Sequence, residues 1–271
     1  SNNVAVGKDA LEEMNPSSAV DMYNTAVGFS AGQKVTTGIN NTLIGANAAD
    51  AITTGDQNVA VGKNALTTLT TGDQNVALGT SALEAATTGS TNVAVGPNAG
   101  GAVTSGGNNI YLGKDAGLSG SPGGNQTDGS NEIGFGDENI STASIQVDWT
   151  VASDARDKTD FTALDLGLDF VKALAPVTYK WDKRSKYGDK TADDYDLNAQ
   201  SPDGTHKEDW LDIGFKAQEV EALEQAAGYN KSNKTNLVSS HTGDGKQMGL
   251  QYSKFVPILV KAIQEQNALI V

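Results

Sequence analysis

The sequence predicts two regions of different fold class. Residues 1–152 are predicted to form a mainly β region, a trimeric stalk built as a parallel β-roll or β-helix, and residues 153–271 a small α+β domain ending in a long helix. Three observations carry this prediction: a 17-residue repeat in the first region, a change of composition at Ser153, and alternating strand-like and helix-like segments after it. The chain begins inside a repeat and without Met, so we expect it to be the C-terminal part of a longer protein.

The composition excludes several classes of function. The net charge is −14, and residues 1–152 hold 14 acidic and 4 basic residues, so nucleic acid is not an expected partner. The chain has no cysteine, which excludes disulfides and thiolate zinc sites. No apolar run approaches the roughly 18 residues that a membrane span needs, so we expect no membrane insertion. We expect no cofactor.

The first region repeats the pattern Asn-x-apolar-apolar-Gly. The glycines that close successive copies are spaced by 21, 17, 17, 17, 17, 17 and 21 residues. An Ala follows three residues after each of the first seven, and a second Gly follows ten residues after each of the five central ones. A period this regular is typical of a repeat architecture. The closing glycines are Gly7, Gly28, Gly45, Gly62, Gly79, Gly96, Gly113 and Gly134.

Each repeat is expected to form one coil of a narrow parallel roll. A 17-residue unit is too short for two packed helices, whereas its alternating segment Asn-Val-Ala-Val-Gly favours a strand. The Gly after the strand allows a tight corner, and the small Ala lets neighbouring walls approach closely. Val and Ala are too small to fill a wide interior, so we expect the roll to be narrow and to pack against identical chains.

Other readings of the repeats stay open. The recurring Thr-Thr-Gly steps permit an ice-binding face, but the Thr-rich corner is irregular at Thr104-Ser105, which disfavours it. A purely mechanical stalk is at least as well supported as ligand binding by the repeats. After the last regular copy, a Gly/Ser-rich loop spans residues 117–131, and a final strand-like copy spans residues 132–136. Residues 144–152, Ser-Ile-Gln-Val-Asp-Trp-Thr-Val-Ala, then alternate as a strand does.

The second region mixes helix and strand signals. Asp165 is predicted to cap a short helix that ends before Pro176. Strands are predicted at residues 177–181, 213–217 and 248–252, and a helix from about Gln218 that Gly228 stops. The polar residues 182–209 are expected to form a surface insertion. Within them, the acidic run 193–196 could hold calcium, but a solvated loop is the simpler reading, and no metal site is expected.

The chain is predicted to close with a helix from about Ser253 whose apolar face has heptad spacing. The five positions recur at intervals of 3, 4, 3 and 4 residues, which is heptad spacing and is compatible with a coiled coil between chains. A helix that packs only on its own domain is the alternative, because two heptads cannot separate the two. The five positions are Val256, Leu259, Ile263, Gln266 and Ile270.

Three sequence landmarks in the second region together carry a family resemblance. Ser-Asp-Ala-Arg-Asp-Lys at residues 153–158 is followed by Ile-Gly-Phe-Lys-Ala-Gln-Glu-Val-Glu from Ile213 and by Leu-Gln-Tyr-Ser-Lys-Phe-Val-Pro from Leu250. In this order they resemble the endosialidase-type intramolecular chaperone, a self-cleaving domain found at the C-termini of phage tail spikes and fibres. The repeats upstream are similar to the head repeats of trimeric autotransporter adhesins and to repeats of phage tail fibres.

This resemblance implies a self-cleavage site at the junction. It makes Ser153 the nucleophile, Lys158 its base and Ala152–Ser153 the scissile bond, because a serine hydroxyl needs a positioned base at neutral pH. Asp154 and Arg156 also match the family pattern, in supporting roles that stay open. Either an N-to-O acyl shift or direct hydrolysis would be compatible. A Ser-Asp turn beside a solvated lysine is the bland alternative.

The implied function is that of a homotrimeric phage tail fibre or spike. Its chaperone domain would drive trimerisation and folding of the stalk, and would then release itself as a single-turnover serine endopeptidase with no other substrate. The expected partners are two further copies of the chain, together with a host-cell receptor or glycan. The expected location is the virion, after synthesis in the host cytoplasm. The alternatives are a non-cleaving trimeric adhesin with a permanent C-terminal cap, and a membrane-tethered transcription factor, which the acidic stalk disfavours.

Overall fold

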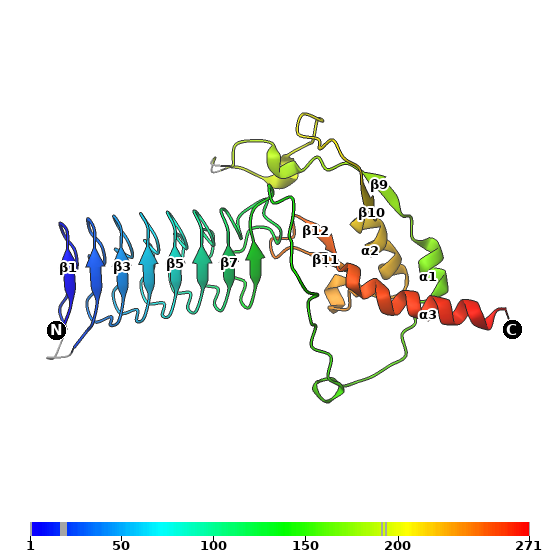
Figure 1. Cartoon of the computed structure of the whole chain (residues 1–271), viewed down its shortest axis with the longest axis horizontal. Helices are drawn as coiled ribbons and strands as arrows, with labels where there is room; N and C mark the ends of the chain where they lie inside the picture. Colours follow the sequence, from blue (N-terminus) through cyan, green and yellow to red (C-terminus); the bar gives the residue numbers. More distant parts are fainter. Residues whose placement is uncertain (1, 17–20, 191, 193, 271) are drawn as a thin grey trace. The chain divides into compact units, whose positions relative to one another are not determined.

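Each repeat folds into one coil of a parallel β-solenoid (Figure 1). The computed structural model describes residues 2–16, 21–190, 192 and 194–270. Eight three-residue strands form one sheet in sequence order, each paired in parallel with the next. The strands are β1 (Val4–Val6), β2 (Thr25–Val27), β3 (Thr42–Ile44), β4 (Val59–Val61), β5 (Val76–Leu78), β6 (Val93–Val95), β7 (Ile110–Leu112) and β8 (Ile133–Phe135). The predicted parallel β-roll or β-helix fold of the first region is confirmed, and its association into a trimer stays a prediction.

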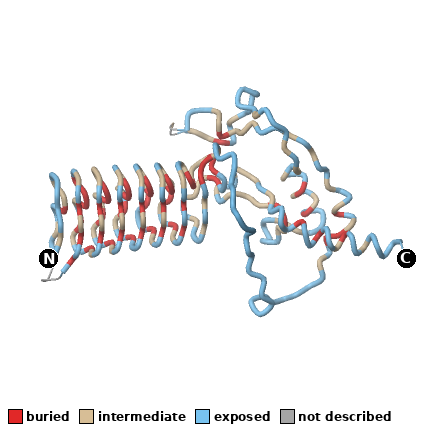
Figure 2. The backbone as a smooth tube through the Cα atoms, viewed as in Figure 1, coloured by how far each residue is buried: buried red, intermediate tan, exposed pale blue. Residues whose placement is uncertain are grey.

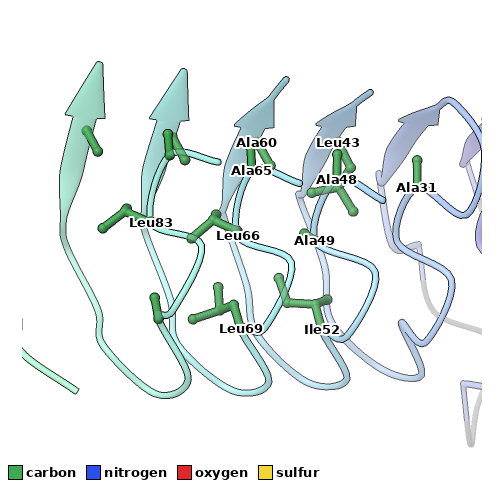
Figure 3. Packing of buried hydrophobic residues seen from close by; sticks show 14 of the residues in the cluster. Ala31, Leu43, Ala48, Ala49, Ile52, Ala60, Ala65, Leu66, Leu69 and Leu83 are labelled. Carbon is green, nitrogen blue, oxygen red and sulfur yellow. The ribbon is translucent and has the colours of Figure 1, made fainter. Parts of the chain in front are cut away.

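The core of the solenoid is a stack of small side chains. In β4 the central Ala60 is fully buried, whereas Val61 beside it is exposed, and the same alternation recurs in the neighbouring strands. The Ala three residues after each closing glycine from Gly28 to Gly113 is also buried, for example Ala65 and Ala82, whereas Ala10 of the first coil is only partly buried. Figure 3 shows Ala60 and Ala65 in the interior of the solenoid together with Leu66 and Leu69. The expected narrow interior is therefore present.

A ladder of buried asparagines ties the coils together. The side-chain Oδ1 of Asn41 accepts hydrogen bonds from the backbone amide of Asn58 at 2.9 Å and from its Nδ2 at 3.2 Å. The Nδ2 of Asn58 also donates to the carbonyl of Gly72 at 2.9 Å. Since a buried amide without partners is costly, this repeated pairing explains why every regular coil keeps Asn directly before its strand. The ladder consists of Asn24, Asn41, Asn58, Asn75, Asn92 and Asn109.

Large core residues are accommodated by glycines around them. Most coils have Ala at the centre of the strand, but β7 has the buried Tyr111. A Cβ added at Gly100, Gly117 or Gly134 would lie 2.8, 2.7 and 3.1 Å from the Tyr111 ring. The absence of side chains at these three positions therefore creates the space for one aromatic ring.

Two substitutions of Tyr111 separate the contribution of its buried ring to stability from that of its hydroxyl group. Tyr111→Ala should lower the free energy of unfolding by about 3–5 kcal/mol, as the loss of a buried aromatic does. Tyr111→Phe should be neutral or stabilising, because the Tyr111 hydroxyl is buried without a hydrogen-bond partner among the described residues. Chemical denaturation of both variants checks this, and a Tyr111→Phe variant as unstable as Tyr111→Ala would contradict it.

Contacts divide the chain into two compact units. One comprises residues 1–140, 183–203 and 243–246, and the other comprises 141–182, 204–242 and 247–271. The predicted boundary between residues 152 and 153 separates a stalk from a chaperone domain, which is a division by function and not by contacts. This boundary stays a prediction. The surface insertion predicted at residues 182–209 is wrong in part, because Ser185 and Leu197 are buried.

Residues 183–203 and 243–246 cover the last coil within the first unit. The Nζ of Lys183 donates to the carbonyl of Glu138 at 2.8 Å, and the side chain of Lys190 pairs with the Glu138 carboxylate. The carboxylate of Asp244 accepts from the amide of Asn125 at 3.0 Å. Two 3₁₀ turns lie in this cap, η2 (Arg184–Lys186) and η3 (Leu197–Ala199). The cap supplies polar partners to a coil that has no further coil beyond it.

In the residues that the structure describes, the second unit holds three helices and two small sheets. Its helices are α1 (Leu168–Ala173), α2 (Ala217–Ala226) and α3 (Phe255–Ala268), and its 3₁₀ turns are η1 (Ala155–Asp157), η4 (Lys231–Asn233) and η5 (Tyr252–Lys254). β9 (Val177–Tyr179) pairs antiparallel with β10 (Asp212–Gly214), and β11 (Ser239–His241) with β12 (Met248–Leu250). The small α+β region with a terminal helix is confirmed. β11 was not predicted.

Three predicted element boundaries in this unit are corrected. Asp165 does not cap α1, because the N-cap residue of this helix is Gly167. The carboxylate of Glu265 in α3 accepts a hydrogen bond from the Leu168 amide at 2.6 Å. The predicted strand 213–217 ends at Gly214, because Ala217 already begins α2. Residues 144–152 form no strand in the single chain. The sequence did not predict these three details because each depends on contacts with residues that are distant in the chain.

Candidate cleavage site

The predicted cleavage site lies in a long exposed segment. Every residue from 141 to 163 is exposed, and Figure 2 shows this stretch as solvent-accessible throughout. Its one regular element is the 3₁₀ turn η1, which follows directly after Ser153 and Asp154. The local geometry of the site is therefore set by short-range hydrogen bonds.

Asp154 forms the N-cap of this turn. Its Oδ1 accepts a hydrogen bond from the Arg156 backbone amide at 2.9 Å. The guanidinium of Arg156 reaches back to the same carboxylate, with Nε at 3.1 Å from Oδ1 and Nη2 at 2.6 Å from Oδ2. These hydrogen bonds from Arg156 hold the pKa of Asp154 below its usual value. Asp154 is thus an ionised cap that shapes the turn.

The turn brings Ser153 and Lys158 together. The Nζ of Lys158 lies 2.7 Å from the Oγ of Ser153, although the two residues are five apart in sequence. An amine at this distance can take the hydroxyl proton if it is neutral, which is the geometry that activation of a serine nucleophile requires. All four residues predicted at the site, Ser153, Asp154, Arg156 and Lys158, therefore form one local cluster.

In the single chain, no neighbouring described residues bury the Ser153–Lys158 cluster. Both Ser153 and Lys158 are exposed, and the bond before Ser153 lies between two exposed residues, Ala152 and Ser153. Burial favours the neutral form of a lysine, and it also strengthens hydrogen bonds to a developing oxyanion. A second surface placed against this segment would supply both effects.

The predicted trimer helix presents one face to its own unit and leaves the other open. Phe255, Ile258 and Ala262 of α3 are buried against the rest of the unit. The five heptad positions lie beside this buried stripe and are all exposed; Val256, Leu259, Ile263 and Gln266 belong to α3, whereas Ile270 lies two residues beyond its last residue, Ala268. The face with heptad spacing is therefore available to other chains.

The sequence analysis missed a buried carboxylate that organises this unit. Glu224 of α2 is fully buried, and its two oxygens accept from the amides of Leu237, Val238 and Ser239 at 2.8, 2.6 and 3.0 Å. The Ser239 hydroxyl also bonds to it. Three amides converging on one carboxylate fix α2 to the start of β11. The sequence feature that could have indicated this burial is the position of Glu224 one helical turn after Val220, on the same apolar face of the helix.

Other candidate sites gain no support from the described residues. Asp193, part of the acidic run weighed as a calcium site, lies outside them, and the described residues contain no group of three or more potential metal ligands. His241 is paired through Nε2 with Glu221 at 2.7 Å. Among the described helices, none has the length and apolar character required to traverse a bilayer.

One comparison with known proteins gives a match, and it covers the first part of the second region. Residues 153–229 match a peptidase-family model described as chaperone of endosialidase. No curated protein and no solved structure matches the chain. The match starts at Ser153, the residue that the exposed turn places against Lys158. Residues 153–229 are therefore a chaperone-of-endosialidase domain, and in this chain the domain follows a parallel β-solenoid.

Proposed function

We propose that this protein is a homotrimeric phage tail fibre or spike whose chaperone domain assembles the solenoid stalk and then cuts itself off between Ala152 and Ser153. The observation that carries this proposal is the 2.7 Å contact of Lys158 Nζ with Ser153 Oγ at the first residue of a chaperone-of-endosialidase domain. Lys158 takes the proton of the hydroxyl, and the Oγ of Ser153 attacks the carbonyl carbon of Ala152. Lys158 returns the proton to the Ser153 nitrogen as the Ala152–Ser153 amide bond breaks, which leaves an ester between Ala152 and the Ser153 Oγ. Water then hydrolyses this ester to the Ala152 carboxylate and restores the Ser153 hydroxyl.

The role of the other two site residues follows from their contacts. Asp154 caps the 3₁₀ turn and is held by Arg156, so this pair keeps Lys158 folded back over Ser153. Both residues are positioning residues in this proposal. The reaction occurs once in each chain, because the nucleophile leaves with the released fragment.

The solenoid surface supports association of three copies. The last residue of each strand points outward and is apolar, and six of these side chains are between 36% and 39% exposed. They form a continuous apolar stripe over the strands, a surface that monomeric soluble proteins rarely expose. The six residues are Val27, Ile44, Val61, Leu78, Val95 and Leu112.

Association also explains how the cut is timed. Long parallel pairing folds slowly and leaves sticky surfaces exposed, so a template that gathers three chains assists it. The open face of α3 provides such a template. If a second copy buries the exposed Ser153–Lys158 pair, cleavage is restricted to assembled chains. Removal of the chaperone domain after cleavage would then leave the stalk kinetically stable.

Mass spectrometry of the purified protein tests this function directly. The protein should yield two fragments that meet between Ala152 and Ser153, whereas Ser153→Ala should remain intact, because the nucleophile is missing. Native mass spectrometry should show three copies in the intact Ser153→Ala protein. An intact wild-type chain in a folded trimer would overturn the enzymatic part and leave the alternative of a permanent C-terminal cap.

A host-cell receptor or glycan is the proposed external partner of the fibre, and the virion is its proposed location. The combination of a solenoid stalk with a chaperone domain supports both proposals. Binding of the cleaved, trimeric stalk to candidate host cells would test them, with the apolar stripe already covered by association.

A further inference from the structure

The segment directly before the scissile bond has the pattern of a strand but no partner. Within the described chain, residues 144–152 form no hydrogen bond. Four apolar side chains alternate along it, and Ile145, Val147, Trp149 and Val151 are 56%, 74%, 76% and 78% exposed. A strand that alternates in this way buries one face when it finds a sheet.

The same unit contains a sheet that lacks a third strand. β9 and β10 pair only with each other, and each has three residues. Isolated two-stranded sheets are marginal in water, and a third strand or a packed helix is needed for independent stability. Both outer edges of this sheet are free of other strands in the described chain.

An apolar groove lies beside this sheet. It has a volume of about 400 Å³ and is lined by residues that include Pro176, Val177, Phe215 and Tyr252. Ile213 of β10 also lines it and is 77% exposed. Pockets of roughly 300–1,000 Å³ hold small organic ligands, so the groove has room for an indole.

We propose that residues 144–151 of one copy add as a third strand to the β9–β10 sheet of a neighbouring copy, with Trp149 in the groove. This inference rests on the proposed trimer and names a contact that holds it together. Addition of an extended segment to a sheet edge is a common recognition mode, in which main-chain hydrogen bonds give affinity and alternate side chains give specificity.

A second copy fits this role better than the chain's own segment. In the single chain, the segment and the sheet edge both remain unpaired. Three copies offer three strands and three sheets, so an exchange in one direction closes a ring in which each sheet gains one strand.

The area involved is sufficient for a specific interface. One Trp side chain buries about 150–250 Å², and three aliphatic side chains add about 60–120 Å² each. Each exchanged strand then buries about 330–610 Å² of its own surface, and with the partner surface that it covers the interface amounts to roughly 700–1,200 Å², which reaches the lower end of the range of specific protein interfaces.

The exchanged strand also acts on the cleavage site. Val151 precedes the scissile bond by one residue, so docking fixes the extended backbone that leads into Ala152 and Ser153. It places the exposed dyad next to the neighbouring copy. Trp149 is therefore a positioning residue for cleavage.

Disulfide trapping between two differently tagged chains tests the exchange, since the natural chain has no cysteine. One chain carries Ser153→Ala with Val147→Cys, and the other carries Ser153→Ala with Ile213→Cys. Mild oxidation of the co-expressed pair should give a covalent heterodimer, because a disulfide forms only when the Cβ atoms lie about 3.5–4.5 Å apart. Gln146→Cys, on the opposite face of the segment, is the matched control and should lose this product.

The outcomes separate this inference from the proposed function. If the trimer forms but the covalent heterodimer does not, the exchange between copies is overturned. The exchange is also overturned if the disulfide forms only when one chain carries both cysteines and links them within that chain. Wild-type cleavage would leave the proposed function standing in either case. A protein that neither trimerises nor cleaves would overturn both.

Discussion

Replacing Lys158 with methionine should stop cleavage between Ala152 and Ser153 while the solenoid and the trimer still form. The side chain is exposed, so its loss removes little packing, but it removes the amine that lies 2.7 Å from the Ser153 hydroxyl. General bases contribute typically about 10²–10⁴-fold to a rate, which is enough to leave the chain intact over a normal purification. Denaturing gel electrophoresis and intact mass after timed incubation measure this loss.

Two further substitutions show why the residue matters. Lys158→Arg keeps the positive charge, but a guanidinium does not lose its proton in proteins, so this variant should also remain intact. Lys180→Met removes an exposed lysine outside the site and should cleave as the wild type does. Cleavage by Lys158→Arg would assign Lys158 an electrostatic role in place of proton transfer, and wild-type cleavage by Lys158→Met would refute the dyad.

Gly62→Ala should destabilise the solenoid by more than about 3 kcal/mol, because it combines backbone strain with a collision. Gly62 has φ +140°, and a Cβ there would lie 2.4 Å from the carbonyl oxygen of Gly79 in the next coil. That oxygen belongs to the backbone and cannot turn away. The expected results are a lower denaturation midpoint and a lower yield of soluble trimer.

Gly123→Ala is the matched control for this experiment. Gly123 lies in the same unit as Gly62 and also has a positive φ, +109°, but an added Cβ there would meet only the end of the flexible Gln126 side chain, at 3.3 Å. Its substitution therefore reports the conformational strain alone, about 1–3 kcal/mol. Equal losses for the two variants would show that the contact between coils is not the cause.

The sequence was sufficient to predict the coils but not their corners. The period of 17 residues and the alternation within Asn58–Gly62 predicted strands that stack in parallel, because both depend only on local pattern. The corners depend on left-handed conformations of ordinary residues, such as φ +59° at Asn64 and φ +55° at Leu66. Leu gives no warning of such a conformation, and it is held here by a hydrogen bond from the Leu66 amide to the carbonyl of Ala82.

The same limit applies to the second region and its site. The resemblance indicated Ser153 and Lys158, but the contact between them arises from a turn that Asp154 caps. Long-range partners were not predictable: Glu265 caps α1 across 97 residues, and Glu224 binds amides more than a dozen positions away. These pairs depend on tertiary packing, which no periodicity in the chain encodes.

The uniform asparagine ladder has a consequence for assembly. Each coil presents the next with the same amide, the same carbonyl and nearly the same side chains, as Asn58 and Asn75 do. In the proposed trimer, a chain displaced by one whole repeat would regain almost every lateral contact and lose those of a single coil. The repeats thus carry no information about which coil belongs opposite which, and their alignment must come from parts that occur only once. The singular coil around Tyr111 and the helical domain beyond residue 153 are the features that can set that alignment before the identical coils meet.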